Sequence, residues 1–211
     1  MRIGIIGAGF AGRAAARLAA QHGHDVMLSN SRDPATLPAT MLSCKVGTNA
    51  DAASFATTVL LVLPFARHTT IAPALLAGKL VLHASDYNPR ADGPIAALDS
   101  RATTASELLA RYFVGARVVK ALNTIPEKEI ERDARPPGTP NRRALAYAGD
   151  DERAKALTAA LYDEFGFDPV DAGGLDDAWR LDVDQPTFVV RMNADELRAN
   201  LAKAERHLAS E

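Results

Sequence analysis

Three glycines near the start of the chain have the spacing of a dinucleotide-binding turn. The stretch that carries them is Gly7-Ala8-Gly9-Phe10-Ala11-Gly12. Gly7 permits a tight turn, Gly9 lets the backbone approach a pyrophosphate with no Cβ in the way, and Gly12 lets the next helix pack close to the strand. A glycine-rich turn that binds nothing is the alternative, but three glycines would then destabilise the turn with no compensating function. The spacing therefore predicts a dinucleotide bound at these residues.

The tip of the second predicted strand indicates which dinucleotide is bound. Strand 25–30 ends about twenty residues past the glycines, where an NAD site places an acid on the ribose 2′-hydroxyl. This chain has Asn30, Ser31 and Arg32 there, and these side chains can donate to a 2′-phosphate. The nearby Asp33 precedes a proline, as an N-cap does. An ordinary solvated arginine is the alternative; the pattern favours NADP(H) over NAD(H).

A strand and a helix flank the glycine turn. Residues 2–6 contain a β-branched run that is typical of a buried parallel strand. Residues 13–22 are strong helix formers, and Gly23 can end that helix. The order of strand, turn and helix predicts phosphates at the helix N-terminus.

The clearest buried strand in the sequence is 57–63, which stops at a proline. In a doubly wound sheet this fourth strand lies beside the first, across the topological switch point. Its carboxyl end should then face the nicotinamide half of the cofactor. We therefore predict cofactor contacts at Leu63, Pro64 and Phe65.

The rest of the chain alternates between short apolar runs and helical segments. Further strands are expected at 45–47, 79–83, 117–122, 144–148 and 168–171. Helices are expected at 34–43, 49–55, 66–76, 106–113 and 150–165, and a loop at 90–101. Near the C-terminus, Asn193 and Glu196 have capping-box spacing. A packing or dimer face is predicted from the apolar stripe of Leu197, Leu201, Ala204 and Leu208.

These patterns predict an α/β fold, a Rossmann doubly wound, mostly parallel sheet with a small C-terminal α/β extension. We expect residues 1–125 to form the dinucleotide-binding core. Residues 126–211 are expected to form the extension, packed on the core and ending in a helix. The boundary rests on a shift in composition, because 127–133 is heavily charged and 135–140 is rich in proline.

The composition excludes several classes of partner. The 211 residues are 47% hydrophobic and 24% charged, as is usual for a globular protein. A net charge of −2 gives no reason to expect nucleic acid or an anionic membrane. No run reaches the length of a membrane span, and the single Cys44 fits a reducing compartment. We expect a cytoplasmic protein that acts on a small molecule.

Five motifs together resemble one family. They are Met-Arg-Ile-Gly-Ile-Ile-Gly-Ala-Gly at 1–9, Ser-Asn-Ser-Arg at 29–32, Val-Val-Lys-Ala-Leu-Asn-Thr at 118–124, Ala-Gly-Asp-Asp at 148–151 and Gly-Phe-Asp-Pro-Val-Asp-Ala-Gly at 166–173. The chain is similar to the small NADP-dependent oxidoreductases that include the reductases of the deazaflavin coenzyme F420. The resemblance implies NADPH bound along the strand tips and hydride transfer to a flat acceptor stacked on the nicotinamide. It implies cofactor roles for the glycines, for 30–32 and for the 63–64 turn. We also expect a homodimer.

Two other functions stay open at this point. One is reduction of an imine or carbonyl in a small metabolite, and the other is a redox sensor that binds NADP(H) without turnover. A carbonyl reductase needs a positioned proton donor, for which the candidates are Tyr87, His68 and Lys120. Each has an ordinary structural explanation: a solvated loop tyrosine, a helix-start histidine, and a lysine whose amine reaches water from a strand end. We assign no catalytic side chain, and no metal-ligand cluster stands out.

Overall fold

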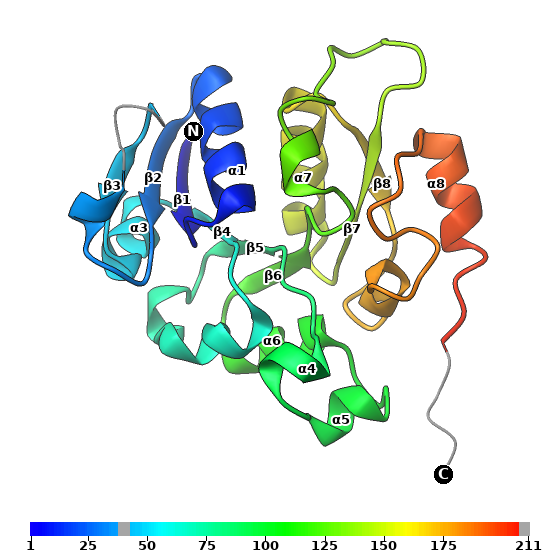
Figure 1. Ribbon diagram of the computed structural model, residues 1–211, viewed down its shortest axis with the longest axis horizontal. Helices are drawn as coiled ribbons and strands as arrows, with labels where there is room; N and C mark the ends of the chain where they lie inside the picture. The colour runs from blue at the N-terminus through cyan, green and yellow to red at the C-terminus, as the bar shows by residue number, and fades with distance from the viewer. Residues whose placement is uncertain (38–42, 207–211) are drawn as a thin grey trace.

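One eight-stranded sheet runs through the computed structural model, which describes residues 1–37 and 43–206 (Figure 1). The strands are β1 Arg2–Ile6, β2 Asp25–Ser29, β3 Lys45–Gly47, β4 Thr58–Leu61, β5 Leu80–His83, β6 Arg117–Lys120, β7 Ala144–Gly149 and β8 Asp168–Asp171. Their order is β3-β2-β1-β4-β5-β6-β7-β8. Neighbours are parallel from β3 to β6, β7 is antiparallel to β6, and β8 is parallel to β7. The first six strands have the Rossmann order, so the predicted fold class is confirmed.

Helices cover both faces of the sheet. The longer ones are α1 Phe10–Gln21, α3 Asn49–Phe55, α6 Ala105–Tyr112, α7 Glu152–Glu164 and α8 Ala194–Leu201. Successive side chains of a strand point to opposite faces: Ile5 packs in one core with α1 and α7, and Ile6 packs in another with α3 and α6. Within the part of the chain described, no helix combines the length and the apolar composition that crossing a membrane requires.

The residues after 125 extend the same sheet instead of starting a new one. β7 pairs with β6, and α8 packs against β7 and β8. The first half of the predicted apolar stripe packs on the chain's own sheet, because Leu197 and Leu201 are buried against these strands. The capping box of Asn193 and Glu196 is present. The stripe's fourth residue, Leu208, lies outside the described residues, and the homodimer stays a prediction.

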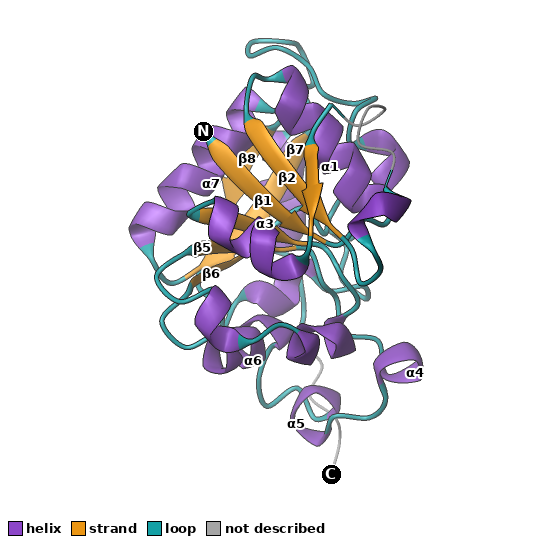
Figure 2. Ribbon diagram, turned by 90° about the vertical axis from the view of Figure 1, so that its left-hand side faces the viewer, coloured by secondary structure: helices purple, strands orange, loops and turns teal. Residues whose placement is uncertain are grey.

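Three local predictions differ from the structure. Residues 66–76 form two 3₁₀ helices, Phe65–Thr70 and Pro73–Leu75, because Pro73 lacks the N–H that a continuous α-helix needs there. The expected loop 90–101 contains two single turns, α4 Pro89–Asp92 and α5 Ala96–Asp99, which lie toward one end of the molecule in Figure 2. The helix expected at 34–43 is a 3₁₀ helix at Pro34–Thr36, and its positions 38–42 lie outside the described residues.

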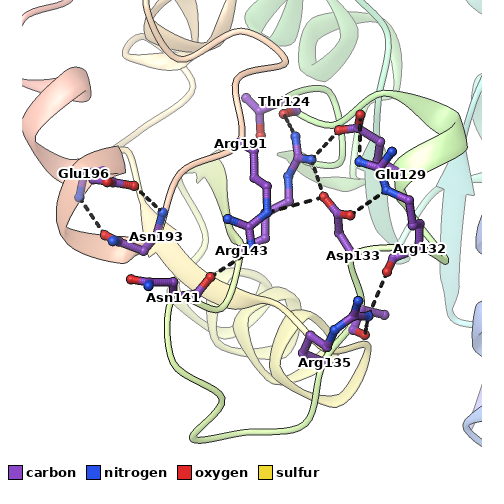
Figure 3. Close-up of polar contacts among 11 residues, drawn as sticks. Thr124, Glu129, Arg132, Asp133, Arg135, Asn141, Arg143, Arg191, Asn193 and Glu196 are labelled. Carbon is purple, nitrogen blue, oxygen red and sulfur yellow. Dashed lines mark hydrogen bonds and ion pairs between the residues drawn. The ribbon is translucent and has the colours of Figure 1, made fainter.

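A buried arginine ties the extension to the core. Arg143, directly before β7, is fully buried, and Figure 3 shows its guanidinium between two carboxylates and a carbonyl. Its Nη1 donates to Glu129 Oε2 at 2.6 Å and to Asp133 Oδ2 at 2.9 Å. Its Nη2 donates to Thr124 O at 3.2 Å, just after β6. The charged segment predicted as a domain boundary thus supplies ion pairs that connect the chain after β6 to the start of β7. We call the cluster of Arg143, Glu129 and Asp133 the joint.

Candidate nucleotide-binding site

Backbone hydrogen bonds bring the carboxyl ends of β2, β1 and β4 together. The Gly7 N–H donates to Ser29 O at 3.0 Å, and the Val62 N–H donates to Ile6 O at 2.8 Å. A cleft of about 680 Å³ opens over these strand ends, a size typical of a site for a small molecule. The predicted cofactor residues that line it are Gly7, Ala8, Gly9, Asn30, Ser31, Arg32, Leu63 and Pro64.

The three glycines serve the turn in two different ways. Gly7 has a φ of +117°, and a Cβ there would lie 1.8 Å from Val62 O. A Cβ at Gly12 would lie 1.9 Å from Gly7 O. Packing of the chain on itself therefore requires both. A Cβ at Gly9 would meet no described atom within 4 Å, so the space above Gly9 belongs to the cleft and fits a pyrophosphate.

The N-terminus of α1 has no side-chain cap. Its N-cap, Gly9, offers none, and the first turn carries no acidic residue. The other long helices, α3, α6, α7 and α8, are capped by the side chains of Thr48, Thr104, Asp151 and Asn193. Uncapped N–H groups and the positive end of the helix dipole bind anions. The first turn of α1 therefore fits a phosphate group of a dinucleotide.

The loop after β2 presents Arg32 to the cleft. Asn30 shapes this loop, since its Oδ1 accepts from the Arg32 N–H at 2.9 Å and its Nδ2 donates to Thr36 Oγ1 at 3.2 Å. Asp33 caps the 3₁₀ helix Pro34–Thr36, as predicted. Within the described residues, the guanidinium of Arg32 has neither a hydrogen bond nor an ion pair, and the residue is exposed. It is therefore available to an anionic ligand.

Four predicted cofactor residues lie outside the lining of the cleft. Phe10 is 82% exposed at the start of α1, Ala11 packs against the core, and Gly12 is buried beneath the turn. Phe65 is 1% exposed, because its ring packs edge-on against Tyr87 and 4.9 Å from the His68 ring. The structure thus assigns Phe65 to the core beneath β4 instead of to a cofactor contact.

Several residues that the sequence analysis missed also line the cleft: Ile6, Arg13, Thr36, Asn49, Val62, Arg67, Thr70 and Ile71. Arg13 could have been found, because helical side chains point toward the N-terminus and Arg13 follows the last glycine of the turn. Arg67 could not, because its place depends on how residues 65–70 turn after β4. The described lining contains no carboxylate.

Lys120 does not reach water, contrary to expectation. It is 1% exposed, and its Nζ lies 2.5 Å from Asp182 Oδ1 and 3.1 Å from Asp86 Oδ1. Burial opposes the charged form, but the two carboxylates raise the pKa of Lys120 above its usual value. Burial and the nearby ammonium lower the pKa of His83 to about 3. Lys120 is therefore a fixed cation at neutral pH.

The other two candidate donors are also held by structural contacts. Tyr87 is partly buried, and its hydroxyl donates to Asp99 Oδ1 at 2.7 Å and accepts from the Ile95 N–H at 2.9 Å, so hydrogen bonds to the following loop fix its position. His68 Nδ1 lies 2.6 Å from Phe65 O. Neither these two side chains nor Lys120 belong to the described lining of the cleft.

The N-terminal part of the sequence, which contains β1 to β5, matches a family model. Residues 2–87 match the family described as NADP oxidoreductase, coenzyme F420-dependent. The protein YjhV of Escherichia coli (strain K12) is 34% identical over 59 residues, which are 28% of this chain and 43% of that protein. The matched segment thus spans less than half of YjhV.

Similar solved structures cover nearly the whole chain. A hypothetical protein of Sinorhizobium meliloti, SMa0349, has a TM-score of 0.74 at 25% identity, over 92% of this chain and 95% of that one. A candidate F420-dependent NADP reductase from Arthrobacter sp. FB24 has a TM-score of 0.69 at 26% identity, over 84% and 87% of the two chains. An imine reductase from Myxococcus stipitatus shares the fold at 17% identity and a TM-score of 0.61, over 84% of this chain and 56% of its own. The predicted resemblance is confirmed over residues 2–87, which match the family of coenzyme F420-dependent NADP oxidoreductases, and the fold of the chain is similar to that of the Arthrobacter NADP reductase.

Proposed function

We propose that this protein transfers a hydride between NADP(H) and a flat acceptor, with the deazaflavin coenzyme F420 as the favoured acceptor. The observation that carries the proposal is the anion-binding cleft over the glycine turn, with its uncapped helix N-terminus, its unpaired Arg32 and no carboxylate in the described lining. The family match at residues 2–87 and the similarity to the Arthrobacter protein support the choice of acceptor.

The order of the strand ends would give a bound dinucleotide a direction. Arg32, after β2, would bind the 2′-phosphate of the adenosine half. The N–H groups of the first turn of α1 would bind the pyrophosphate. The turn at Leu63 and Pro64, after β4, would contact the nicotinamide half, because that strand lies across the switch point from β2.

The residues of the cleft suit hydride transfer without a side-chain acid. When bound, NADPH supplies the hydride. The described lining contains no Tyr, His, Lys, Cys, Asp or Glu that could move a proton. Reduction of a deazaflavin ring needs none at the accepting carbon, and the ring nitrogen can take its proton from water. The chain would then act by holding two flat rings together, so that proximity and orientation supply most of the rate.

A panel of acceptors tests the proposal. Purified protein is mixed with NADPH and either coenzyme F420, a flavin, a cyclic imine or an aldehyde, and loss of nicotinamide absorbance is followed. We expect turnover with coenzyme F420 and slow or no turnover with the imine and the aldehyde, whose reduction requires a proton donor. Turnover confined to the imine or aldehyde would contradict the proposed acceptor. Absence of NADPH binding by calorimetry would contradict the proposed site.

A further inference from the structure

Two more arginines accompany Arg32 in the cleft. Arg13 lies in the first part of α1, and Arg67 lies in the 3₁₀ helix Phe65–Thr70 that follows β4. The described lining therefore holds three guanidinium groups and no carboxylate. A 2′-phosphate carries about −1.5 to −2 charges at pH 7, and one arginine can pair with it. The other two call for a second anionic group.

Arg13 is fixed across the glycine turn. Its Nε donates to Ala8 O at 2.8 Å, so the side chain folds back toward the start of α1. Its backbone N–H donates to Gly9 O at 3.0 Å. Its two terminal amino groups have no partner in the part of the chain that the structure describes. Arg13 and Gly9 line the same cleft, in which the pyrophosphate is expected.

Arg67 stands on the other side of the turn from Arg32. β1 lies between β2 and β4 in the sheet, and Arg32 follows β2 whereas Arg67 follows β4. The Arg67 N–H donates to Pro64 O at 2.9 Å, which starts the 3₁₀ helix at the exit of the strand. The residue is exposed, and its guanidinium makes no contact with a charged side chain within residues 1–37 and 43–206. A ligand extended from β2 to β4 would meet Arg32, the α1 N-terminus with Arg13, and then Arg67.

We propose that Arg13 and Arg67 bind the pyrophosphate from two sides, with Arg67 on the phosphate nearer the nicotinamide, while Arg32 alone reads the 2′-phosphate. This inference rests on the proposed binding of NADP(H). Arginine suits the role because its planar fork donates two parallel hydrogen bonds to phosphate oxygens. Arg67 would then strengthen binding of either dinucleotide, and Arg32 would decide between them.

Four ligands separate these roles by calorimetry: NADPH, NADH, ADP-ribose and adenosine 2′,5′-bisphosphate. ADP-ribose has the pyrophosphate without the 2′-phosphate, and the bisphosphate has the 2′-phosphate without the second phosphate. Arg67→Ala should weaken NADPH, NADH and ADP-ribose about ten-fold each and leave the bisphosphate unchanged. Arg32→Ala should weaken only NADPH and the bisphosphate. Arg13→Gln, which keeps a donor for Ala8 O, should weaken all four ligands, because the bisphosphate keeps the 5′-phosphate of the adenosine half.

Arg153→Ala is the matched control, because Arg153 is an exposed arginine of α7 outside the cleft. It should change none of the four affinities. Weakening of only NADPH and the bisphosphate by Arg67→Ala would make Arg67 a second 2′-phosphate ligand and overturn the inference, as would unchanged affinity for all four ligands. If the wild-type protein bound none of the ligands, the proposed function itself would fail. Circular dichroism of each variant confirms that it is folded.

Discussion

At the scale of single residues, the proposed cofactor binding depends on two positions of the cleft: Arg32, which would select the cofactor, and Gly9, which would leave room for it. Arg32 is held in place only through its backbone, because Asn30 accepts its N–H and its guanidinium is unpaired within the described chain. Gly9 is the one glycine of the turn that the chain's own packing leaves open. Substitutions at either position should therefore change the affinity for the dinucleotide more than the stability of the fold.

Arg32→Ala should lower the affinity for NADPH and spare NADH. Removing a charge-assisted contact to phosphate costs on the order of 1.5–3 kcal/mol, which is roughly a ten- to hundred-fold loss of affinity. NADH lacks the 2′-phosphate, so its dissociation constant should stay nearly unchanged. Calorimetric titration with both cofactors measures the difference. Equal losses for the two would show that Arg32 supports the loop instead of reading the phosphate.

Gly9→Ala should abolish dinucleotide binding in a protein that stays folded. Gly9 has a φ of −69°, which alanine adopts readily, and its Cβ would meet no described atom within 4 Å. The methyl group would instead occupy the space of the pyrophosphate. Gly12→Ala is the contrasting variant, because its Cβ would lie 1.9 Å from Gly7 O and should destabilise the fold. Normal NADPH affinity in Gly9→Ala would mean that the cofactor binds elsewhere.

At the scale of elements, the ends of β5 and β6 are joined by a buried ionic triad instead of an acid–base pair. Lys120 ends β6, Asp86 follows β5, and Asp182 comes from the segment after 3₁₀ helix Ala178–Leu181. Asn123 adds a hydrogen bond from its Nδ2 to Asp86 Oδ1 at 3.1 Å. The triad fixes the loop after β5 beside the Leu63 end of the cleft, since Ser85 in turn donates to Leu63 O at 2.8 Å.

Lys120→Met should therefore cost stability more than activity. Removing one partner of a buried pair typically costs 3–5 kcal/mol. Asp182 is 37% exposed, so water offsets part of this, and we expect about 3 kcal/mol in urea unfolding. Below the unfolding transition, turnover should fall less than about ten-fold, against the 10²–10⁴ of a lost proton donor. Lys203→Met, at an exposed lysine, is the control. A thousand-fold drop in turnover with intact NADPH affinity would instead make Lys120 a proton donor and favour a carbonyl or imine reductase.

At the scale of the whole molecule, the joint around Arg143 makes core and extension one sheet. A hydrogen bond from Arg143 lowers the pKa of Glu129 below its usual range. Burial opposes the same effect at Asp133, but hydrogen bonds from Arg132 and Arg143 still lower the pKa of Asp133. Carboxylates with a lowered pKa in the folded state stabilise it above their ordinary pKa and lose that contribution as pH falls through the folded value. The joint should therefore weaken in acid.

Urea unfolding at pH 7 and at pH 3 tests this joint. The free energy of unfolding of the wild-type protein should be lower at pH 3. The unfolded chain takes up protons at Glu129 and Asp133 below their ordinary pKa values near 4, whereas the folded chain does so only at lower pH. Arg143→Met should cost about 3 kcal/mol at pH 7 by leaving two carboxylates unpaired. Between pH 7 and pH 3, the free energy of unfolding of Arg143→Met should fall by less than that of the wild-type protein. An equal acid sensitivity in both proteins would place the acid-labile contacts elsewhere in the chain.

The sequence by itself determined the features that depend on local pattern. The strand–glycine–helix order, the Arg32 position and the strands from β1 to β8 follow from residue spacing, β-branched runs and turn residues, which act over a few neighbours. The capping box of α8 and the N-cap of Asp33 were readable for the same reason. The glycine turn and the open helix N-terminus that follows it are therefore predictable from the sequence.

Tertiary structure alone decided what distant segments do together. Phe65 looked like a cofactor contact because it follows β4, but its ring packs under the sheet against Tyr87, 22 positions along the chain. Lys120 looked like a residue reaching water, but Asp182, 62 residues away, meets it in the interior. Arg67 entered the cleft only because Pro73 and the residues before it turn as 3₁₀ helices after the strand. Such contacts depend on the crossing of elements in space, which no spacing along the sequence encodes.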